Sequence, residues 1–446
     1  MVRIKFIFWF SLGLLSALWL SADTWRPQPF TYFSFRAVFM QYSGVIATGV
    51  MSMAIVLASR ARWLEPRLDG LDKMYRLHKW LGITALIASL LHWWWGKGTK
   101  WMVGWGWLSR PSRRPPSSTV SDLGLIEGWL RAQRGLAESA GEWAFYAVLV
   151  LLVLALVKRF PYHLFTKTHK WLSIAYLVLI YHSVVLLKAA YWARPIGWVM
   201  AVLMVAGTTG ALWALLGRIG ATRKVQGAIE SLHYYPELRV LESGIVMAPG
   251  WPGHRAGQFA FVTSSKREGA HPYTIASAWR AEDHRIVFIT KALGDHTRRL
   301  PERLKVGMPV TVEGPYGCFD FQDERPRQIW IGAGIGITPF VARMKQMAGQ
   351  PDAKPIDLFH PTSVYEQAAI DKLTADAAAA GIHLHLLVAD QDGRLDGARI
   401  RAEVPDWAMA SIWFCGPPMF GKSLRDDFIA HGMSAKHFHQ ELFQMR

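Results

Sequence analysis

Four histidines stand within or beside two apolar stretches, where an ionisable or metal-binding side chain is costly and usually functional. His78 and His92 are 14 residues apart in the first stretch, and His169 and His182 are 13 residues apart in the second. At 1.5 Å per residue, each pair is separated by about 20 Å along a helix. Histidine is a common axial ligand of haem iron. We therefore predict two stacked haems, one held by His78 and His169 and the other by His92 and His182.

The helical phases of the two pairs differ. At about 100° per residue, a separation of 14 returns to nearly the same helix face, whereas a separation of 13 lags by about 140°. The second helix therefore needs a local bulge or a tilt to present both rings to the first. The alternative is that the histidines are interfacial or hydrogen-bonded and bind no metal. Because two pairs matched in depth are harder to explain in that way, we favour haem.

The histidines lie among elements whose composition is typical of membrane spans. Six segments of the first half contain no Asp, Glu, Lys or Arg, and each is 15 to 23 residues long. A helix needs roughly 20 apolar residues to cross a bilayer. The sequence therefore predicts a six-helix transmembrane bundle, with the short fourth span extended by snorkelling of Lys158 and Arg159. The predicted spans are Phe6–Ala22, Ala37–Ser59, Trp80–Gly96, Trp143–Val157, Trp171–Leu187 and Pro195–Gly217.

Composition limits the class of protein. The 446 residues carry a net charge of +17, 22 Trp and two cysteines. Residues 1–217 hold 23 Lys and Arg against 8 Asp and Glu, which leaves +15, and 17 of the Trp. The basic excess therefore belongs to the membrane half, which argues against nucleic acid as a partner and favours membrane lipid. The sequence contains only two cysteines, Cys318 and Cys415. This number is too small for a disulfide scaffold or for a Cys-based zinc or iron–sulfur centre.

The short loops indicate an orientation. Loop 60–79 carries six Lys and Arg and loop 158–170 carries four, whereas loops 23–36 and 188–194 carry two each. Because basic residues are enriched in cytoplasmic loops, we expect a multi-pass inner-membrane protein with both termini in the cytoplasm. The beginning of the chain also resembles a signal peptide, but we expect a retained first span. The long, basic, Trp-rich loop 97–142 would attract anionic chelates or anchor at lipid headgroups.

From Arg218 the pattern becomes that of soluble domains. Short β-rich runs between Gly and Pro turns predict a small antiparallel β-barrel over residues 218–324. Alternating strands and helices then predict an α/β doubly wound domain over 325–446, so that the fold class is a multidomain membrane protein with its membrane domain at 1–217. The expected strands are Leu238–Val246, Gln258–Ser264, Arg285–Lys291, Met308–Glu313, Ile329–Ile331, Ile356–Phe359, His383–Ala389 and Ser411–Cys415.

Two glycine-containing motifs fall at one predicted edge of the α/β sheet. GAGIGITPF (residues 332–340) follows one strand, and CGPPM (415–419) follows a later one. Glycines let a backbone turn approach a pyrophosphate at a helix N-terminus, and ligands of doubly wound sheets bind at the carboxyl ends of strands. Each motif alone is often a plain turn, but together they predict a dinucleotide site. The expected binding residues are Gly332, Gly334, Gly336, Thr338, Pro339, Cys415, Gly416, Pro417, Pro418 and Met419.

Two motifs in the barrel region are suited to a flavin. HPYTIAS (271–277) places an aromatic ring between hydroxyls, which could stack a flavin ring and hydrogen-bond its edge. KALGDHT (291–297) offers a cation, a glycine turn and a hydroxyl for a pyrophosphate. Each alone is ordinarily a strand–turn segment. The expected binding residues are His271, Pro272, Tyr273, Thr274, Ile275, Ser277, Lys291, Gly294, Asp295 and Thr297.

In this order, the motifs resemble those of the NADPH oxidase and ferric reductase superfamily, in a bacterial form with ferredoxin-reductase-type domains. The resemblance covers nearly the whole chain. It implies FAD, NADPH or NADH, and two b-type haems with the four histidines as iron ligands. It also implies that Tyr273 stacks on the isoalloxazine, that residues 293–297 hold the flavin pyrophosphate and that Cys415 faces the nicotinamide. The residues expected to act in catalysis are Tyr273, Thr274, Cys415 and Phe443.

Three features depart from the family pattern. The stretch FHPTS (359–363) lacks the Arg that binds a 2′-phosphate, so NADPH and NADH both remain open. Three later arginines could substitute, although surface charge is the favoured explanation for them: Arg394, Arg399 and Arg401. Phe443 is followed by three more residues, as in bacterial ferredoxin-reductase-type proteins, whereas animal oxidases end at the aromatic that covers the flavin. The sequence contains no calcium-binding extension, which favours constitutive activity.

The resemblance implies electron transfer across the membrane from cytoplasmic NAD(P)H to an acceptor outside. The acceptor is open between O₂, which would yield superoxide or hydrogen peroxide, and a ferric chelate. An alternative from another class is a partner-coupled or redox-sensing membrane subunit that does not turn over efficiently on O₂ or Fe³⁺.

Overall fold

The computed structural model describes residues 2–109, 125–157, 159–265, 267–349 and 354–441. The chain divides into two compact units, one made mainly of residues 1–68 and 73–219 and the other of residues 69–72 and 220–445. The boundary lies close to the predicted end of the membrane domain at residue 217. The further division of the second unit at residue 324 stays a prediction.

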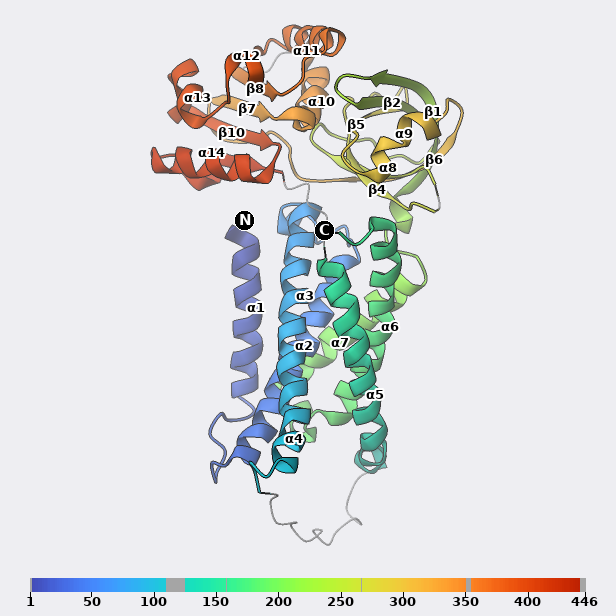
Figure 1. Ribbon diagram of the computed structural model, residues 1–446, viewed down its shortest axis with the longest axis vertical. Coiled ribbons are helices and arrows are strands. Elements are labelled where there is room, and N and C mark those ends of the chain that lie inside the picture. The colour runs from blue at the N-terminus through green and yellow to red at the C-terminus, as the bar shows by residue number, and fades with distance from the viewer. Residues whose placement is uncertain (1, 110–124, 158, 266, 350–353, 442–446) are drawn as a thin grey trace. The chain divides into compact units, whose positions relative to one another are not determined.

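The first unit consists of long helices that run side by side (Figure 1). Five of those in the described part of the chain are long and apolar enough to cross a membrane: Arg3–Leu20, Tyr32–Ala58, Glu127–Leu156, Leu164–Leu186 and Pro195–Leu215. They belong to α1 (Val2–Leu20), α2 (Tyr32–Ala58), α5 (Leu125–Leu156), α6 (Tyr162–Leu186) and α7 (Pro195–Leu215). The predicted third span lies mostly in α3 (Leu71–Trp93), which has 23 residues but begins with charged side chains and is therefore less apolar.

The fourth span is longer than predicted. We expected an apolar segment that starts at Trp143, but α5 begins at Leu125 and so includes much of the predicted loop 97–142. Ion pairs one helical turn apart support this extension: Glu127 with Arg131 at 3.8 Å and Arg134 with Glu138 at 3.1 Å. The charges that suggested a loop are therefore paired along a helix.

Hydroxyl groups and small residues join the helices of the first unit. Ser52 of α2 contacts the Tyr176 hydroxyl of α6 at 2.7 Å, and Thr48 of α2 contacts Ser183 of α6 at 2.8 Å. A Cβ at Gly207 of α7 would overlap the Tyr176 hydroxyl. In lipid, close approach at small residues and hydrogen bonds between helices replace the hydrophobic driving force.

The second unit contains a six-stranded antiparallel sheet with the strand order β4-β3-β6-β1-β2-β5. Its terminal strands are linked by a bridge between Ile275 and Phe288, and the Ala276 amide donates to the Val287 carbonyl at 2.8 Å. The four predicted strands are confirmed as β2, β3, β5 and β6, whereas β1 and β4 were missed. The strands are β1 (Lys224–Tyr235), β2 (Val240–Met247), β3 (Phe259–Thr263), β4 (His271–Thr274), β5 (Arg285–Lys291) and β6 (Pro309–Tyr316).

The same unit contains a five-stranded parallel sheet with the order β11-β10-β7-β8-β9, as the α/β pattern predicts. Alternate residues of its central strand are buried in two separate cores, Trp330 in one and Ile329 and Ile331 in the other, because helices cover both faces. The elements are β7 (Arg327–Gly332), α10 (Thr338–Met347), β8 (Ile356–Thr362), α11 (Gln367–Ala379), β9 (His383–Val388), α13 (Gly397–Glu403), β10 (Ala410–Cys415), α14 (Pro418–Ala430) and β11 (Phe438–Gln440).

The contact at Gly207 predicts a measurable loss of stability. We expect Gly207→Ala to lower the free energy of unfolding by about 1–3 kcal/mol, because the added methyl group overpacks the site beside Tyr176. Gly135→Ala in α5 is the matched control, since a Cβ there meets no atom within 4 Å. Helix propensity favours alanine at such a position by up to about 1 kcal/mol. Thermal unfolding of the full chain in detergent measures both variants, and equal melting temperatures would contradict the packing assignment.

Candidate functional site

Two facing pairs of imidazoles connect α3 with α6. The ring centroids of His78 and His169 are 5.9 Å apart, and those of His92 and His182 are 6.2 Å apart. An iron bonded to one nitrogen of each ring at about 2 Å, the ordinary metal–imidazole distance, would hold the two centroids roughly 6 Å apart. The structure therefore brings together the pairs that the sequence predicted, at a spacing that fits a shared iron. Whether the iron belongs to haem stays a proposal.

In most of these rings, one nitrogen is hydrogen-bonded to a neighbouring helix of the same chain. Nδ1 of His78 lies 2.8 Å from the Ala54 carbonyl, and Nδ1 of His182 lies 2.8 Å from the Ala137 carbonyl. A carbonyl only accepts, so Nδ1 carries the proton in both rings and Nε2 keeps its lone pair. Metal-bound histidines characteristically have this arrangement. In His169, Nδ1 is buried with no hydrogen-bond partner among the described residues.

The sequence predicts a bulge or a tilt of α6 to bring both of its histidines to α3. The helix runs as an unbroken α-helix from Tyr162 to Leu186, so the bulge is not found. A tilt is the remaining explanation. The π-helical turn nearest to the site instead follows α3, at Trp94–Gly98, directly after His92. Arg36 of α2 donates to the carbonyls of Trp95 and Gly96 in this turn.

A cavity of about 650 Å³ opens beside His92 and His182, which both line it. Two glycines allow the backbone to approach these rings: a Cβ at Gly44 would touch His92 at 3.4 Å, and one at Gly141 would overlap His182. Cofactor pockets commonly have volumes of about 300–1,000 Å³. The size and the histidine lining therefore fit a haem-sized group.

Most of the cations that line this cavity are paired. Lys97 lies 2.6 Å from Glu142, and Lys188 forms an ion pair with Asp23. Arg131 and Arg134 form the pairs within α5 described above. Of the four Lys and Arg of segment 97–142 that the structure describes, three are therefore paired inside the protein: Lys97, Arg131 and Arg134. The attraction of chelates or headgroups by residues 97–142 stays a prediction, and residues 110–124 of this segment lie outside the described residues.

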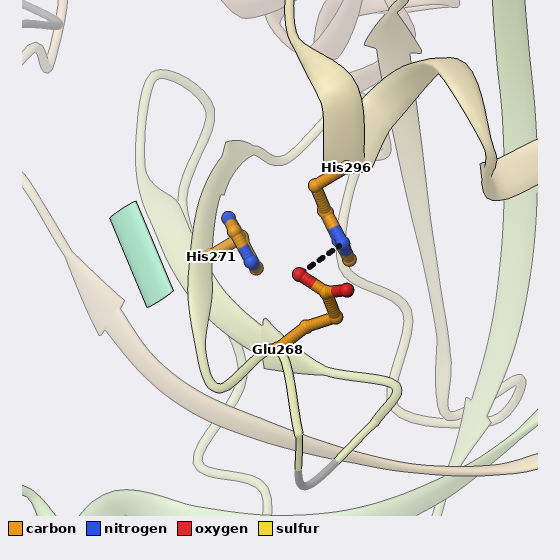
Figure 2. A group of neighbouring side chains, drawn as sticks. All are labelled: Glu268, His271 and His296. Atoms are coloured by element: carbon orange, nitrogen blue, oxygen red, sulfur yellow. Dashed lines mark ion pairs between the residues drawn. The ribbon is translucent and has the colours of Figure 1, made fainter. Parts of the chain in front are cut away.

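The two predicted flavin motifs meet in the antiparallel sheet. The His271 ring of β4 stacks on the His296 ring of α8 (Asp295–Arg298), with centroids 3.8 Å apart and planes 5° apart. Figure 2 shows the two rings side by side with Glu268, whose carboxylate lies 3.7 Å from His296 Nδ1. Burial, together with the neighbouring imidazole, lowers the pKa of His271 to about 4, so the ring is neutral at pH 7. His296 lies within the motif KALGDHT but was not among the expected binding residues.

Several predicted flavin residues hold the local backbone. The Thr297 hydroxyl accepts from the amides of Leu293 and Gly294, both at 3.0 Å, and so fixes the glycine turn. The Ser277 hydroxyl accepts from the Val287 amide at 3.0 Å. Of the remaining residues, Pro272 and Tyr273 are half-buried in β4, Thr274 and Ile275 are buried, and Gly294 and Asp295 are exposed. Their contact with a flavin stays a prediction.

The two nucleotide motifs meet at the carboxyl ends of β7 and β10, which are adjacent in Figure 1. The Ala333 amide donates to the Cys415 carbonyl at 3.0 Å, and a Cβ at Gly336 would overlap the same carbonyl. Thr338 and Pro339 begin α10, and Pro418 and Met419 begin α14. Since the chain continues to β8 on one side of β7 and returns to β10 on the other, this edge is the topological switch point of the sheet.

His360 of β8 supports the glycine loop and was missed from the sequence. Its buried Nδ1 donates to the Gly332 carbonyl at 2.7 Å, and burial lowers its pKa so that the ring stays neutral. A cavity of about 110 Å³ beside it is also lined by Lys291 and Gly334. The sequence pattern of residues 359–363 indicates only the lack of an arginine there. Lys291, expected at the flavin pyrophosphate, thus lies near the nucleotide loop.

Of the other two predicted catalytic residues, the structure describes only Cys415. Cys415 is 2% exposed, and burial raises the pKa of its thiol well above the usual value, with Glu441 adding to the effect. The thiol is therefore protonated and is not an activated nucleophile. Phe443 lies outside the described residues.

Comparison with known proteins gives two family matches. Residues 43–180 match the ferric reductase like transmembrane component, and residues 247–319 match an FAD-binding domain. The first match includes His78, His92 and His169, and it ends two residues before His182. The second includes both flavin motifs. The transmembrane match, with several long apolar helices, makes the chain a multi-pass membrane protein.

Curated relatives match this chain over only part of its length. The chain is 26% identical over 185 residues to an NADPH oxidoreductase of Mycobacterium tuberculosis, which covers 39% of this chain and 49% of that protein. It is 27% identical over 215 residues to respiratory burst oxidase homolog protein E of Arabidopsis thaliana, which covers 42% of this chain and 22% of that protein. The chain thus spans about half or less of the length of these relatives.

Among solved structures, a ferredoxin reductase in carbazole 1,9a-dioxygenase is similar, with a TM-score of 0.42, 19% identity and coverage of 49% of this chain and 69% of that one. A likeness at that level carries no argument about function. The argument about function rests instead on the two family matches, on their order along the chain and on the similarity to the oxidase homologue. The two matched domains, in this order along the chain, are consistent with the NADPH oxidase and ferric reductase superfamily.

Proposed function

We propose that this protein is a transmembrane oxidoreductase that takes electrons from cytoplasmic NAD(P)H and delivers them to an acceptor at the outer face. When bound, FAD would convert a hydride donor into single electrons, and two b-type haems would conduct these across the bilayer. The observation that carries the proposal is the pair of facing imidazoles at each of two levels of the helical bundle. Hydrogen-bonded structural histidines would not require two such pairs.

The residues of the bundle would hold and orient the haems. His78 and His182 would present Nε2 to iron, because the carbonyls of Ala54 and Ala137 occupy Nδ1. These carbonyls fix the ring orientation and increase the basicity of the ligand nitrogen. The glycine at residue 141 leaves the space that the His182 ring needs.

The residues of the second unit would bind the nucleotide and the flavin. The turns after β7 and β10 would bind NAD(P)H, with the Ala333–Cys415 hydrogen bond keeping them together. Tyr273 and Thr274 of β4 would lie against the flavin ring. Because its thiol is protonated and buried, Cys415 would act by contact beside the nicotinamide, without forming a covalent bond. Phe443 would lie near the flavin, as the resemblance implies.

We propose O₂ or a ferric chelate as the acceptor, and membrane lipid as the surrounding partner. The inner membrane and cytoplasmic termini follow from the loop charges and belong to the same proposal. A partner-coupled or redox-sensing subunit is the alternative. It differs in one property: NAD(P)H oxidation would stay slow with every small-molecule acceptor supplied.

The first prediction concerns haem content. In His92→Ala, we expect about half of the wild-type haem absorbance, because one iron loses a ligand while the other pair is unchanged. His431→Ala, an exposed position in the second unit, is the matched control. The reduced-minus-oxidised spectrum of purified protein measures the effect. An unchanged haem signal in His92→Ala would refute the pairing.

The second prediction concerns the nucleotide. We expect kcat/KM for NADH to equal or exceed that for NADPH, because the end of β8 offers no arginine to a 2′-phosphate. Of the substitutes, Arg401 forms an ion pair with Asp427, and Arg399 donates to the Asp392 carbonyl. Steady-state rates with both nucleotides test this expectation. A preference for NADPH of tenfold or more would mean that another cation binds the phosphate.

The third prediction tests the function itself. Membranes that contain the protein should oxidise NAD(P)H when supplied with O₂ or a ferric chelate, and the Gly336→Val variant should lose this activity because its side chain would strike the Cys415 carbonyl. Superoxide-dismutase-sensitive reduction of a reporter identifies O₂ as the acceptor, and insensitive Fe²⁺ formation identifies the chelate. Slow oxidation with both acceptors would favour the alternative subunit.

A further inference from the structure

Two histidines and an aspartate meet at the end of the parallel sheet where the strands begin. The nucleotide motifs lie at the opposite end, where the strands finish. His383 is the first residue of β9 and Asp357 the second residue of β8, so both lie at the amino ends of their strands. His385 follows two residues later, and side chains at i and i+2 of a strand share one face. No motif discussed above includes these residues.

Both imidazoles lie within hydrogen-bonding distance of the same carboxylate oxygen. Oδ1 of Asp357 lies 3.1 Å from His383 Nδ1 and 3.0 Å from His385 Nε2. The three ligand atoms all lie within 4.8 Å of one another. In a tetrahedral site with metal–ligand bonds of 2.0–2.1 Å, neighbouring ligand atoms are about 3.3 Å apart. The contacts are therefore within a few tenths of an ångström of the spacing that a metal ion would impose.

The surroundings hold two of the ligands and leave the third accessible. Asp357 is 2% exposed, and Arg327 binds its other oxygen, Oδ2, at 2.6 Å. His385 stacks on Phe359 with centroids 4.2 Å apart and planes 5° apart. The His383 side chain is 72% exposed, so an ion can enter from solvent and keep a water ligand. Three protein ligands with an open fourth position are a recurrent pattern of accessible zinc sites.

Two other clusters have a similar composition. In the Glu268–His271–His296 group, the ligand atoms also lie within 4.8 Å of one another, but the two imidazole rings stack with planes 5° apart and belong to the flavin segment (Figure 2). Asp323 contacts His437 at 3.0 Å and His439 at 2.7 Å. Within the described residues, however, this cluster is not among the groups whose ligand atoms all lie within 4.8 Å.

We propose that Asp357, His383 and His385 form a binding site for a divalent transition-metal ion that links β8 to β9. Imidazole and carboxylate ligands suit zinc, and Cu²⁺ and Ni²⁺ follow the same ligand preference. Arg327 shares the negative charge of Asp357, so we expect micromolar rather than nanomolar affinity. The site is independent of the proposed electron transfer, since it uses none of the cofactor residues.

Zinc binding to the full chain in detergent, after removal of any polyhistidine tag, tests the proposal. The wild type is expected to bind one more zinc per chain than His383→Ala or His385→Gln in equilibrium dialysis at micromolar zinc. His439→Ala is the matched control, because it removes a histidine from the comparable Asp323 cluster and should bind as much zinc as the wild type.

A second readout separates metal binding from structural damage. Zinc should raise the melting temperature of the second unit in the wild type and in His439→Ala, because an ion that binds only the folded state stabilises it. It should not do so in His383→Ala, whose exposed side chain can be removed without opening the core. Equal zinc binding in the wild type, His383→Ala and His385→Gln would overturn the proposal, as would adventitious binding that His439→Ala reduces to the same extent.

Discussion

Burial of imidazoles in an apolar bundle is the constraint on which the first unit depends. A buried ring nitrogen is costly unless it is bonded, and here Nδ1 of three rings finds Ala54, Ser43 or Ala137. In the two rings that donate to a carbonyl, these bonds leave Nε2 with its lone pair. α3 and α6 therefore face each other through these two ring pairs, and a cavity of about 650 Å³ lies beside His92 and His182.

The second unit meets a different requirement, which is to keep two chain turns close enough to share one ligand. The Ala333–Cys415 hydrogen bond joins the turns that follow β7 and β10, and the glycine at residue 336 makes their approach sterically possible. His360 also supports the end of β7, because its Nδ1 donates a hydrogen bond to the Gly332 carbonyl. The facing histidines of the bundle and the adjacent turns at the sheet edge are the two arrangements that the resemblance to this superfamily implies.

Histidine has several different roles in this chain, and the surroundings decide which. In the bundle the rings face each other across two helices, so their nitrogens converge. At β4 and α8 the rings stack, and burial keeps the His271 ring neutral. At each outer strand of the parallel sheet, two histidines separated by one residue contact a carboxylate. The pair on β9 contacts Asp357, and the pair at β11 contacts Asp323. Residue type alone therefore does not identify a metal site, whereas convergence of lone pairs does.

The sequence by itself determined the apolar spans, the pairing of the four histidines, most strands of both sheets and the common edge of the two glycine motifs. These features depend on local composition and on helical or strand periodicity, which a linear pattern carries. Only the tertiary structure decided the length of α5, the carbonyls that orient His78 and His182, the support of the glycine loop by His360 and the meeting of Asp357 with His385. The α5 ion pairs are at i and i+4, a spacing that the sequence carries but that a charge-free definition of the spans passes over. The other three features join groups that are distant in the chain, and no spacing in the sequence encodes which of them will touch.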